Sequence, residues 1–257
     1  MTTIHPTAII DPDAQLGVDL DIGAYSIVGP HVQIGDRTRI MPHVFLDGRT
    51  KIGAACVIFP FASIGSQTQD LKFKGGTTYV EIGDQTTLRE YVTVNSGTNE
   101  GDLTRVGSRC HILAYSHVAH QCVIGNDVII SNATQLAGHV NVEDGVGFGG
   151  MCGVHQFVRI GTMCFIGGCS KVTQDIPPYM LADGNPAIPR GINAVGLQRR
   201  NVSEDARKIL KEAFKILYRQ KLTTQQALVQ IKADLPVCAE RDRLADFVAA
   251  SERGIAR

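Results

Sequence analysis

The sequence predicts a mainly β fold, a parallel β-helix built from six-residue repeats and followed by a small helical domain. Between Ile4 and Val172 every sixth residue is Ile, Leu, Val or Phe in constant register, and only Asp70, Gly76 and Glu100 break the series. An amphipathic helix would repeat its apolar residues about every 3.6 positions, and hairpins joined by variable turns would not keep a single period. Each repeat is therefore expected to pair with its neighbours along a solenoid.

The other positions of the repeat agree with a narrow prism. Gly often follows the aliphatic residue, as at Gly23 and Gly107, which suits a chain that turns a corner every six residues. The fifth position is small or β-branched, as at Ala8, Ser26 and Thr134. We expect positions one and five to face inward.

Two complete repeats, Ile4-His5-Pro6-Thr7-Ala8-Ile9 and Ile22-Gly23-Ala24-Tyr25-Ser26-Ile27, resemble the hexapeptide-repeat family. The resemblance implies a left-handed parallel β-helix with three hexads per coil. The period alone determines neither the hand nor the size of the coil.

Two loops are expected to interrupt the β-helix domain, which is predicted over residues 1–178. The three exceptions to the register fall in polar stretches near 66–79 and 95–105, and the six-residue phase is intact beyond each. These stretches are predicted to be surface loops that leave the scaffold undisturbed.

The repeats end after Val172, and a connecting segment is predicted over 179–202. Gly184-Asn185-Pro186 and Pro189 lie in this segment. Proline and glycine at these positions oppose a continuous helix or a central strand. We expect turns there and neither kind of regular element.

A C-terminal helical domain is predicted over 203–257, where the apolar period changes to that of a helix. Ser203 can cap a first helix, and Thr223 with Gln226 forms a capping-box pattern before a second. A third helix is expected to end before Gly254. A domain of this size needs to pack on something else to be stable.

Composition limits the possible partners. The 25 basic and 25 acidic residues balance, so no net charge attracts nucleic acid or an anionic membrane. The N-terminal residues enter the first repeat directly, and no apolar run approaches the length of a membrane span. We expect a cytoplasmic protein with no membrane span.

The seven cysteines are predicted to fill the core and not to form a redox or metal site. Neither a CxxC motif nor an even disulfide framework is present, which favours a reducing compartment. Cys169 and Cys238 do not occupy the inward fifth position of a hexad. The other five occupy the inward fifth position of a hexad: Cys56, Cys110, Cys122, Cys152 and Cys164.

Chemistry must come from outward positions, and all eight histidines are outward. If three hexads form a coil, hexads on the same face of successive coils are spaced about 4.8 Å apart. Three histidines then form a column on one face, and a fourth lies at the preceding corner: His120, His139, His155 and His117.

A zinc site is the first competing interpretation of this column. Some hexapeptide-repeat proteins that resemble carbonic anhydrases bind a metal through three histidines at subunit interfaces. They place two ligands five residues apart, whereas His117 and His120 are three apart, and the column lacks an evident carboxylate second shell. We therefore expect no metal, and we interpret the histidines as a general base with polar substrate contacts.

Six motifs, taken in order and spacing, resemble the UDP-N-acetylglucosamine O-acyltransferase family over nearly the whole chain. They are Gln69-Asp70-Leu71-Lys72, His117-Val118-Ala119-His120, Leu136-Ala137-Gly138-His139-Val140, Val154-His155-Gln156-Phe157, Gly167-Gly168-Cys169-Ser170 and Gly196-Leu197-Gln198-Arg199-Arg200.

The resemblance implies transfer of a (R)-3-hydroxyacyl chain from acyl carrier protein to the glucosamine 3-position of UDP-N-acetylglucosamine, the first step of lipid A biosynthesis. His120 would be the general base, and the Gly138 amide would stabilise the oxyanion. No cofactor is implied, because the donor is a phosphopantetheine thioester. A homotrimer with its sites in the clefts between subunits is also implied.

Substrate contacts follow from the same resemblance. Gly168 would be the acyl-chain ruler, since glycine leaves room for a long chain. The residues expected to hold the sugar, with His117 beside them, are Gln69, Asp70, Lys72, His139 and His155. Those expected to contact the nucleotide are Gln156, Asn193, Arg199 and Arg200, whose paired guanidinium groups suit a diphosphate.

Three departures from the family pattern concern selectivity. Asn95-Ser96 stands where many relatives have His-Arg, Gln121 where an acidic residue is common, and Val195 where a polar nucleotide contact is expected. The acceptor could therefore carry a 3-hydroxyl or a 3-amino group. The fold is also compatible with a short-chain acetyltransferase that uses acyl-coenzyme A and with a noncatalytic scaffold.

Overall fold

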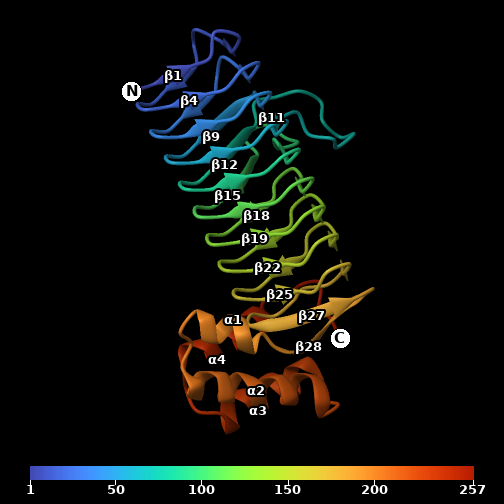
Figure 1. Cartoon of the computed structure of the whole chain (residues 1–257). Coiled ribbons are helices and arrows are strands. Elements are labelled where there is room, and N and C mark those ends of the chain that lie inside the picture. Colours follow the sequence, from blue (N-terminus) through green and yellow to red (C-terminus); the bar gives the residue numbers. More distant parts are fainter.

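The computed structural model covers residues 1–257 and consists of a long β-helix closed at its C-terminal end by helices. Figure 1 shows the coils stacked in sequence order, with the first coil uncovered at one end and the helices packed against the other. Short strands separated by corners form three parallel sheets, which are the three faces of a prism. The predicted left-handed β-helix is confirmed.

Each sheet collects every third strand. Sheet I contains β1 (Thr3–Ile4), β4 (Asp21–Ile22), β7 (Arg39–Ile40), β10 (Val57–Ile58), β13 (Thr87–Leu88), β16 (His111–Ile112), β19 (Ile129–Ile130), β22 (Gly147–Phe148), β25 (Phe165–Ile166), β27 (Met180–Gly184) and β28 (Ala187–Ile192). Sheet II contains β2 (Ile9–Ile10), β5 (Ile27–Val28), β8 (Phe45–Leu46), β11 (Ser63–Ser66), β14 (Thr93–Asn95), β17 (His117–Val118), β20 (Gln135–Leu136), β23 (Gly153–Val154) and β26 (Lys171–Val172). Sheet III contains β3 (Gln15–Leu16), β6 (Gln33–Ile34), β9 (Arg49–Ile52), β12 (Tyr79–Ile82), β15 (Leu103–Val106), β18 (Val123–Ile124), β21 (Asn141–Val142) and β24 (Arg159–Ile160).

The strand register places equivalent positions of the repeat above one another in successive coils. Val118 in β17 pairs with Leu136 in β20, one coil further along. The first-position residues are buried throughout the regular coils, and so are the fifth-position residues. Ile4 in the first coil is 43% exposed because no coil covers it.

Buried hydroxyl and thiol groups at the fifth position find partners in the backbone. The Thr134 hydroxyl donates to the Gly149 carbonyl at 3.0 Å, which removes the cost of burying it. The five predicted core cysteines are buried. Burial raises the pKa of the Cys110 thiol to about 11 and that of Cys122 to about 12, so both stay protonated and unreactive.

The corners differ from the expectation in one respect. The left-handed residue of a corner is the fourth of the hexad, such as Tyr115 or His139, and not the glycine at position two. The glycine is needed for close approach: a Cβ at Gly107 would lie 2.4 Å from the Gly125 carbonyl oxygen of the next coil. Close packing against the next coil, and not the turn of the chain at the corner, therefore requires glycine at this position.

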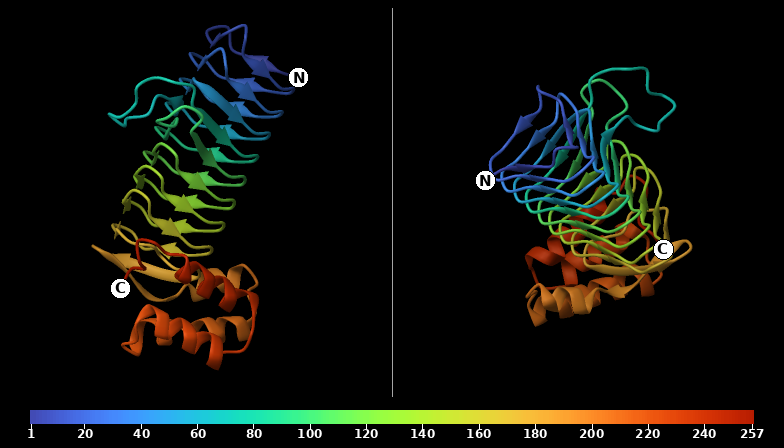
Figure 2. Two further views of the ribbon diagram at one scale, coloured as in Figure 1. Left: turned by 180° about the vertical axis from the view of Figure 1, so that it is seen from behind. Right: turned by 45° about the horizontal axis from the view of Figure 1, so that its top comes forward.

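Two loops leave the prism side by side, between β11 and β12 and between β14 and β15 (Figure 2). Hydrogen bonds tie them together. The Asn95 side-chain amide donates to the Gln67 carbonyl at 3.1 Å, and the Thr77 amide donates to the Glu100 carboxylate at 2.7 Å. The strands on either side of both loops keep their sheets.

The expectation of an irregular connecting segment is wrong. β27 adds to the end of sheet I beside β25, and β28 pairs antiparallel with β27. The Gly184-Asn185-Pro186 stretch lies at the tip of this hairpin, and Pro189 is tolerated because β28 is the outermost strand. A short helix, α1 (Ala194–Arg199), follows.

Three longer helices complete the chain: α2 (Glu204–Arg219), α3 (Thr224–Asp234) and α4 (Ala239–Ala249). Ser203 caps α2 by accepting from the Ala206 amide, and Thr223 and Gln226 form the predicted capping box of α3. The Ser251 hydroxyl donates to the buried Asp175 carboxylate at 2.7 Å, which joins the end of the chain to the last coil.

Candidate active site

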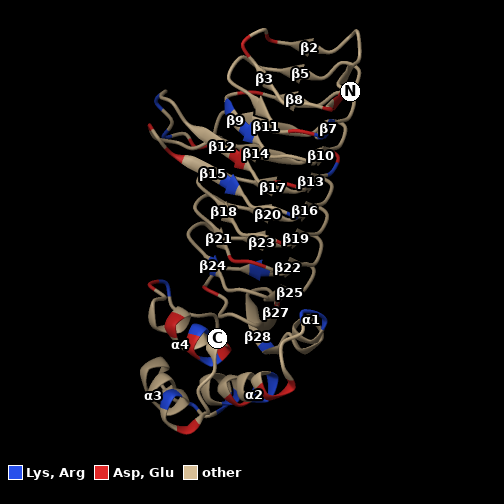
Figure 3. Ribbon diagram, turned by 90° about the vertical axis from the view of Figure 1, so that its left-hand side faces the viewer, with Lys and Arg blue, Asp and Glu red and all other residues tan.

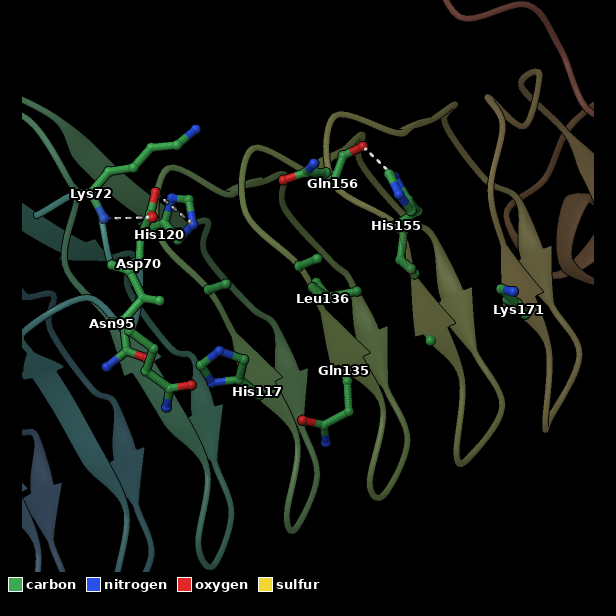
Figure 4. A pocket seen from close by; sticks show the side chains of 16 residues that line it. Asp70, Lys72, Asn95, His117, His120, Gln135, Leu136, His155, Gln156 and Lys171 are labelled. Carbon is green, nitrogen blue, oxygen red and sulfur yellow. Dashed lines mark hydrogen bonds and ion pairs between the residues drawn. The ribbon is translucent and has the colours of Figure 1, made fainter.

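A cavity of about 780 Å³ lies on the outer face of sheet II, under the two loops. Figure 4 shows Asp70, Lys72 and His120 at one end and His155 and Lys171 toward the other. The lining includes seven of the predicted site residues: Gln69, Asp70, Lys72, His117, His120, His155 and Gln156.

His120 lies at the corner between sheets II and III, with its side chain only 15% exposed. Its Nδ1 is hydrogen bonded to the side-chain oxygen of Gln121. Its Nε2 lies 3.9 Å from a carboxylate oxygen of Asp70. A hydrogen bond therefore holds the ring at Nδ1, whereas Nε2 faces the cavity beside the Asp70 carboxylate.

Asp70 is supplied by the first loop. The Lys72 amide donates to its carboxylate at 3.0 Å. This hydrogen bond, followed by the nearby His120 and Lys72 side chains, holds the pKa of Asp70 below its ordinary value. Asp70 is therefore ionised at neutral pH and faces the imidazole as an anion.

His117 lies on β17, three residues before His120 in the same coil. Its Nδ1 is 2.7 Å from the Thr93 hydroxyl of β14. Burial, and next the neighbouring His120, lower the pKa of His117 below its ordinary value. The cavity wall therefore carries a neutral imidazole at pH 7.

Gly138 lies on the coil after His120, directly against the imidazole. A Cβ at this position would be 2.2 Å from the ring, so only glycine allows the observed position of His120. The Gly138 amide has no hydrogen-bond acceptor within the chain. It is therefore available as a donor beside the imidazole.

The other two histidines of the column take different places. The His139 ring meets His120 edge to face at a centroid distance of 5.3 Å and stacks on Phe157 at 4.4 Å. His139 does not line the cavity, whereas His155 does, with its Nδ1 3.0 Å from the Gln156 carbonyl oxygen. His139 packs beside the imidazole of His120.

The predicted nucleotide contacts Asn193 and Arg200 lie at the corner between sheets III and I, away from His120. Asn193 caps α1 and donates to the Met163 carbonyl at 2.9 Å. Arg200 packs against Gly145 and donates to the Asp127 carbonyl at 3.2 Å. Within one chain, Asn193 and Arg200 therefore do not line the cavity. Arg199, the last residue of α1, does not line it either.

Gly168 lies at the third corner, between sheets I and II, three residues before the cavity residue Lys171. A Cβ there would be 3.3 Å from the nearest atom, the Gly150 carbonyl oxygen. The fold therefore leaves almost enough room for a side chain at Gly168.

Comparison with known proteins identifies the family. Residues 175–256 match the family model described as Udp N-acetylglucosamine O-acyltransferase, Domain 2, and residues 103–138 match Bacterial transferase hexapeptide (six repeats). The acyl-(acyl-carrier-protein)-UDP-N-acetylglucosamine O-acyltransferase of Thermodesulfovibrio yellowstonii is 47% identical over 100% of both chains. This chain belongs to the UDP-N-acetylglucosamine O-acyltransferase family.

Solved structures agree with this assignment. LpxA from Acinetobacter baumannii is 43% identical, with a TM-score of 0.95 over 99% of each chain. LpxA from Bacteroides fragilis, a UDP-N-acetylglucosamine acyltransferase, is 38% identical with a TM-score of 0.97 over 99% of this chain and 100% of that one. The resemblance seen in the six motifs is confirmed.

Two structural findings accompany this acyltransferase fold. No group of three or more His, Cys, Asp and Glu side chains is arranged to hold a metal ion. None of the helices is both long and apolar enough to span a bilayer.

Sequence analysis did not identify Asp102, whose carboxylate is linked to His120 through the side chain of Gln121. Gln121 donates through its side-chain amide to the Asp102 carboxylate, on the second loop. Gln121 could be recognised in the sequence as a departure from the family pattern. Asp102 could not, because it lies in a stretch without periodicity, where no repeat arithmetic places a side chain.

The lowered pKa of His117 predicts a stability that depends on pH. The unfolded chain binds a proton near the ordinary histidine pKa of about 6.5, whereas the folded chain resists protonation. The free energy of unfolding should therefore fall as pH decreases below about 6.5. In His117→Asn this dependence should be shallower, as measured by denaturant unfolding between pH 5 and 7.5. His31→Asn, at an exposed position, is the control, and equal slopes in parent and His117→Asn would contradict the argument.

Proposed function

We propose that this chain transfers a (R)-3-hydroxyacyl group from acyl carrier protein to the 3-hydroxyl of UDP-N-acetylglucosamine, the first step of lipid A biosynthesis. The observation that carries the proposal is the arrangement of His120, held at Nδ1 and facing the cavity and Asp70 with Nε2. The relative from Thermodesulfovibrio yellowstonii is named for the same acyl donor and acceptor.

His120 acts as the general base. Its Nε2 accepts the proton of the sugar 3-hydroxyl while the hydroxyl oxygen attacks the thioester carbonyl. The imidazolium that forms lies 3.9 Å from the Asp70 carboxylate. Opposite charges at this distance attract each other, so Asp70 favours the charged state that develops during the reaction.

The Gly138 amide stabilises the tetrahedral oxyanion. Its N–H lacks an acceptor within the chain and lies beside the base, and a preorganised donor of this kind needs no reorganisation. Collapse of the intermediate breaks the C–S bond, and the His120 imidazolium returns its proton to the departing phosphopantetheine thiolate. The acyl ester and a free thiol are the products, and no further cofactor is consumed.

The polar lining holds the acceptor. Gln69, Asp70 and Lys72 reach the cavity from the first loop, and His155 and Gln156 line its wall on the later coil. These side chains offer both donors and acceptors to the sugar and its nucleotide. His139 supports the position of the base through its edge contact with the His120 ring.

A homotrimer completes the site in this proposal. The aromatic ring ladder at the corner between sheets I and II is stacked but exposed: Tyr25, His43, Phe61, Tyr91 and Tyr115, with centroids 4.8–5.2 Å apart. The strands of sheet II beside it contain few charged residues (Figure 3). Both features favour burial against another copy of the chain.

The geometry of a prism then supplies the missing nucleotide contacts. If three copies meet at the ladder corner, sheet II of one copy faces sheet I of the next. The His120 corner of the first copy then lies beside the neighbour's corner between sheets III and I, where Asn193 and Arg200 are found. Each cavity would be closed by a second subunit, and the acyl chain would run along the closed cleft.

The cytoplasm is the proposed location, because acyl carrier protein thioesters are made and used there. The balanced net charge of the chain gives no attraction to nucleic acid, and no helix spans a membrane.

The role of His120 is tested by His120→Ala with the acyl carrier protein thioester and UDP-N-acetylglucosamine. Turnover should fall by about 10²- to 10⁴-fold, the usual contribution of a positioned proton acceptor, while the fold persists. His31→Ala, at an exposed position on an early coil, should match the parent. The same assay with acyl-coenzyme A and with a 3-amino UDP-sugar compares the other donor and acceptor. Near-normal turnover by His120→Ala would overturn the proposed mechanism, and a preference for acyl-coenzyme A or for the 3-amino sugar would overturn the proposed specificity.

Shared sites predict complementation between two inactive variants. His120→Ala lacks the base and Arg200→Ala lacks a diphosphate contact, so each alone should lose most activity. A trimer mixed from both contains one intact site out of three, so co-expression should restore up to about one third of parent activity. The measurement is turnover of purified mixed trimers carrying two different tags. A mixture as inactive as its parents would show that both residues act within one subunit.

The ruler role of Gly168 predicts a change in chain-length preference. Gly168→Met should favour a chain several carbons shorter, because each methylene denied burial loses about 0.8 kcal/mol. Gly168→Ala should shift the preference less, since its Cβ meets only one close atom. The measurement is kcat/KM for a series of acyl carrier protein thioesters. An unchanged ranking with lower overall rates would make Gly168 a structural residue.

A further inference from the structure

Behind His120 lies a pair of polar side chains that the mechanism above does not use. The Gln121 side-chain oxygen is hydrogen bonded to His120 Nδ1, and the Gln121 side-chain NH₂ donates to the Asp102 carboxylate. The Gln121 backbone amide donates to the Thr104 hydroxyl at 2.9 Å, which anchors this residue at the corner. The three side chains form one continuous row, His120, Gln121 and Asp102.

Asp102 is itself held by its own loop. The Asn99 backbone amide and side-chain amide both donate to the Asp102 carboxylate, at 2.7 and 3.0 Å. These bonds fix the carboxylate at the outer end of the row. An ionised carboxylate can only accept hydrogen bonds, so it can face only the NH₂ end of the Gln121 amide.

The orientation of the Gln121 amide in turn determines which nitrogen of His120 carries the hydrogen. With its NH₂ toward Asp102, Gln121 presents its oxygen to His120, and that oxygen can only accept. Nδ1 of His120 must then carry the hydrogen, and the lone pair lies on Nε2, on the side of the cavity and Asp70. That tautomer is the one a general base at Nε2 requires.

We infer that Asp102 is a positioning residue for the acyl transfer, which selects the His120 tautomer through the Gln121 amide. The inference rests on the proposed role of His120 as the base. One side chain separates the Asp102 carboxylate from His120, and the neutral Gln121 amide transmits its effect.

Substitutions of Gln121 and Asp102 test the inference. In Gln121→Glu two carboxylates face each other, and in Asp102→Leu the Gln121 amide is free to turn over. Each variant should lower kcat by about 10- to 10³-fold, less than the roughly 10⁴-fold that a fully wrong tautomer costs in a serine protease. KM for UDP-N-acetylglucosamine should change little. The double variant Gln121→Glu with Asp102→Leu leaves one carboxylate acceptor facing His120 Nδ1 and removes the opposing carboxylate, so kcat should return to within a few fold of the parent.

A second measurement does not depend on turnover. Imidazole ¹⁵N chemical shifts of His120, assigned with His120→Ala, should show the Nδ1–H tautomer in the parent and a mixture in Asp102→Leu. Asp102→Ala, which also removes the acceptor, serves if the leucine variant fails to fold. Glu100→Gln is the matched control in the same loop, because its side-chain oxygen can still accept from Thr77. It should match the parent in kcat and tautomer.

The outcomes separate this inference from the proposed function. The predicted 10²- to 10⁴-fold loss in His120→Ala, together with parent-like kcat and tautomer in Asp102→Leu or Asp102→Ala, would overturn the role of Asp102 alone. A double variant whose loss equals the product of its two single losses would also overturn it, because a merely structural loop contact gives additive effects. Near-normal turnover in His120→Ala would instead overturn the role of the base.

Discussion

Parallel hydrogen bonding between successive coils is the constraint on which the rest of this molecule depends. Each regular strand contributes only two residues to its sheet, so a coil is stable only while its neighbours hold the same register. The register places like hexad positions above one another, and the interior therefore fills with stacked aliphatic and small residues. The same stacking sets His120 on one coil directly against Gly138 on the next, so the scaffold itself fixes the distance between the proposed base and the proposed oxyanion donor.

The periodic part of the chain could be predicted almost completely from sequence, because a fixed repeat converts residue number into position. That arithmetic found the buried cysteines, the loops and the histidines of sheet II. It failed where the repeat stops. The connecting segment forms a hairpin because β27 can extend a sheet that already exists, and local proline and glycine signals do not reveal this tertiary pairing. Asp102 was missed for the same reason, since its place depends on how an irregular loop folds back.

The corner that carries His120 combines both kinds of structure. The coils hold His120 and its neighbour Gly138, while the two loops supply the charged groups on either side of the imidazole, Asp70 toward Nε2 and Asp102 behind Gln121. Hydrogen bonds join the two loops, so the position of Asp70 is linked to that of Asp102. The electrostatic environment of the base is thus set by segments that can vary in sequence without disturbing the repeats.

The two ends of the β-helix differ, because further elements cover only the C-terminal end. The last coil is covered by the β27–β28 hairpin and the helices, and Asp175 ties the chain end to it. The first coil has no such cover, and Ile4 remains exposed although it occupies an inward position of the repeat. Coils should therefore peel away one after another from the N-terminal end, while the end nearest the helices opens last. Since the corner that carries His120 lies several coils inside, the N-terminal coils can fray repeatedly without the proposed site losing its shape.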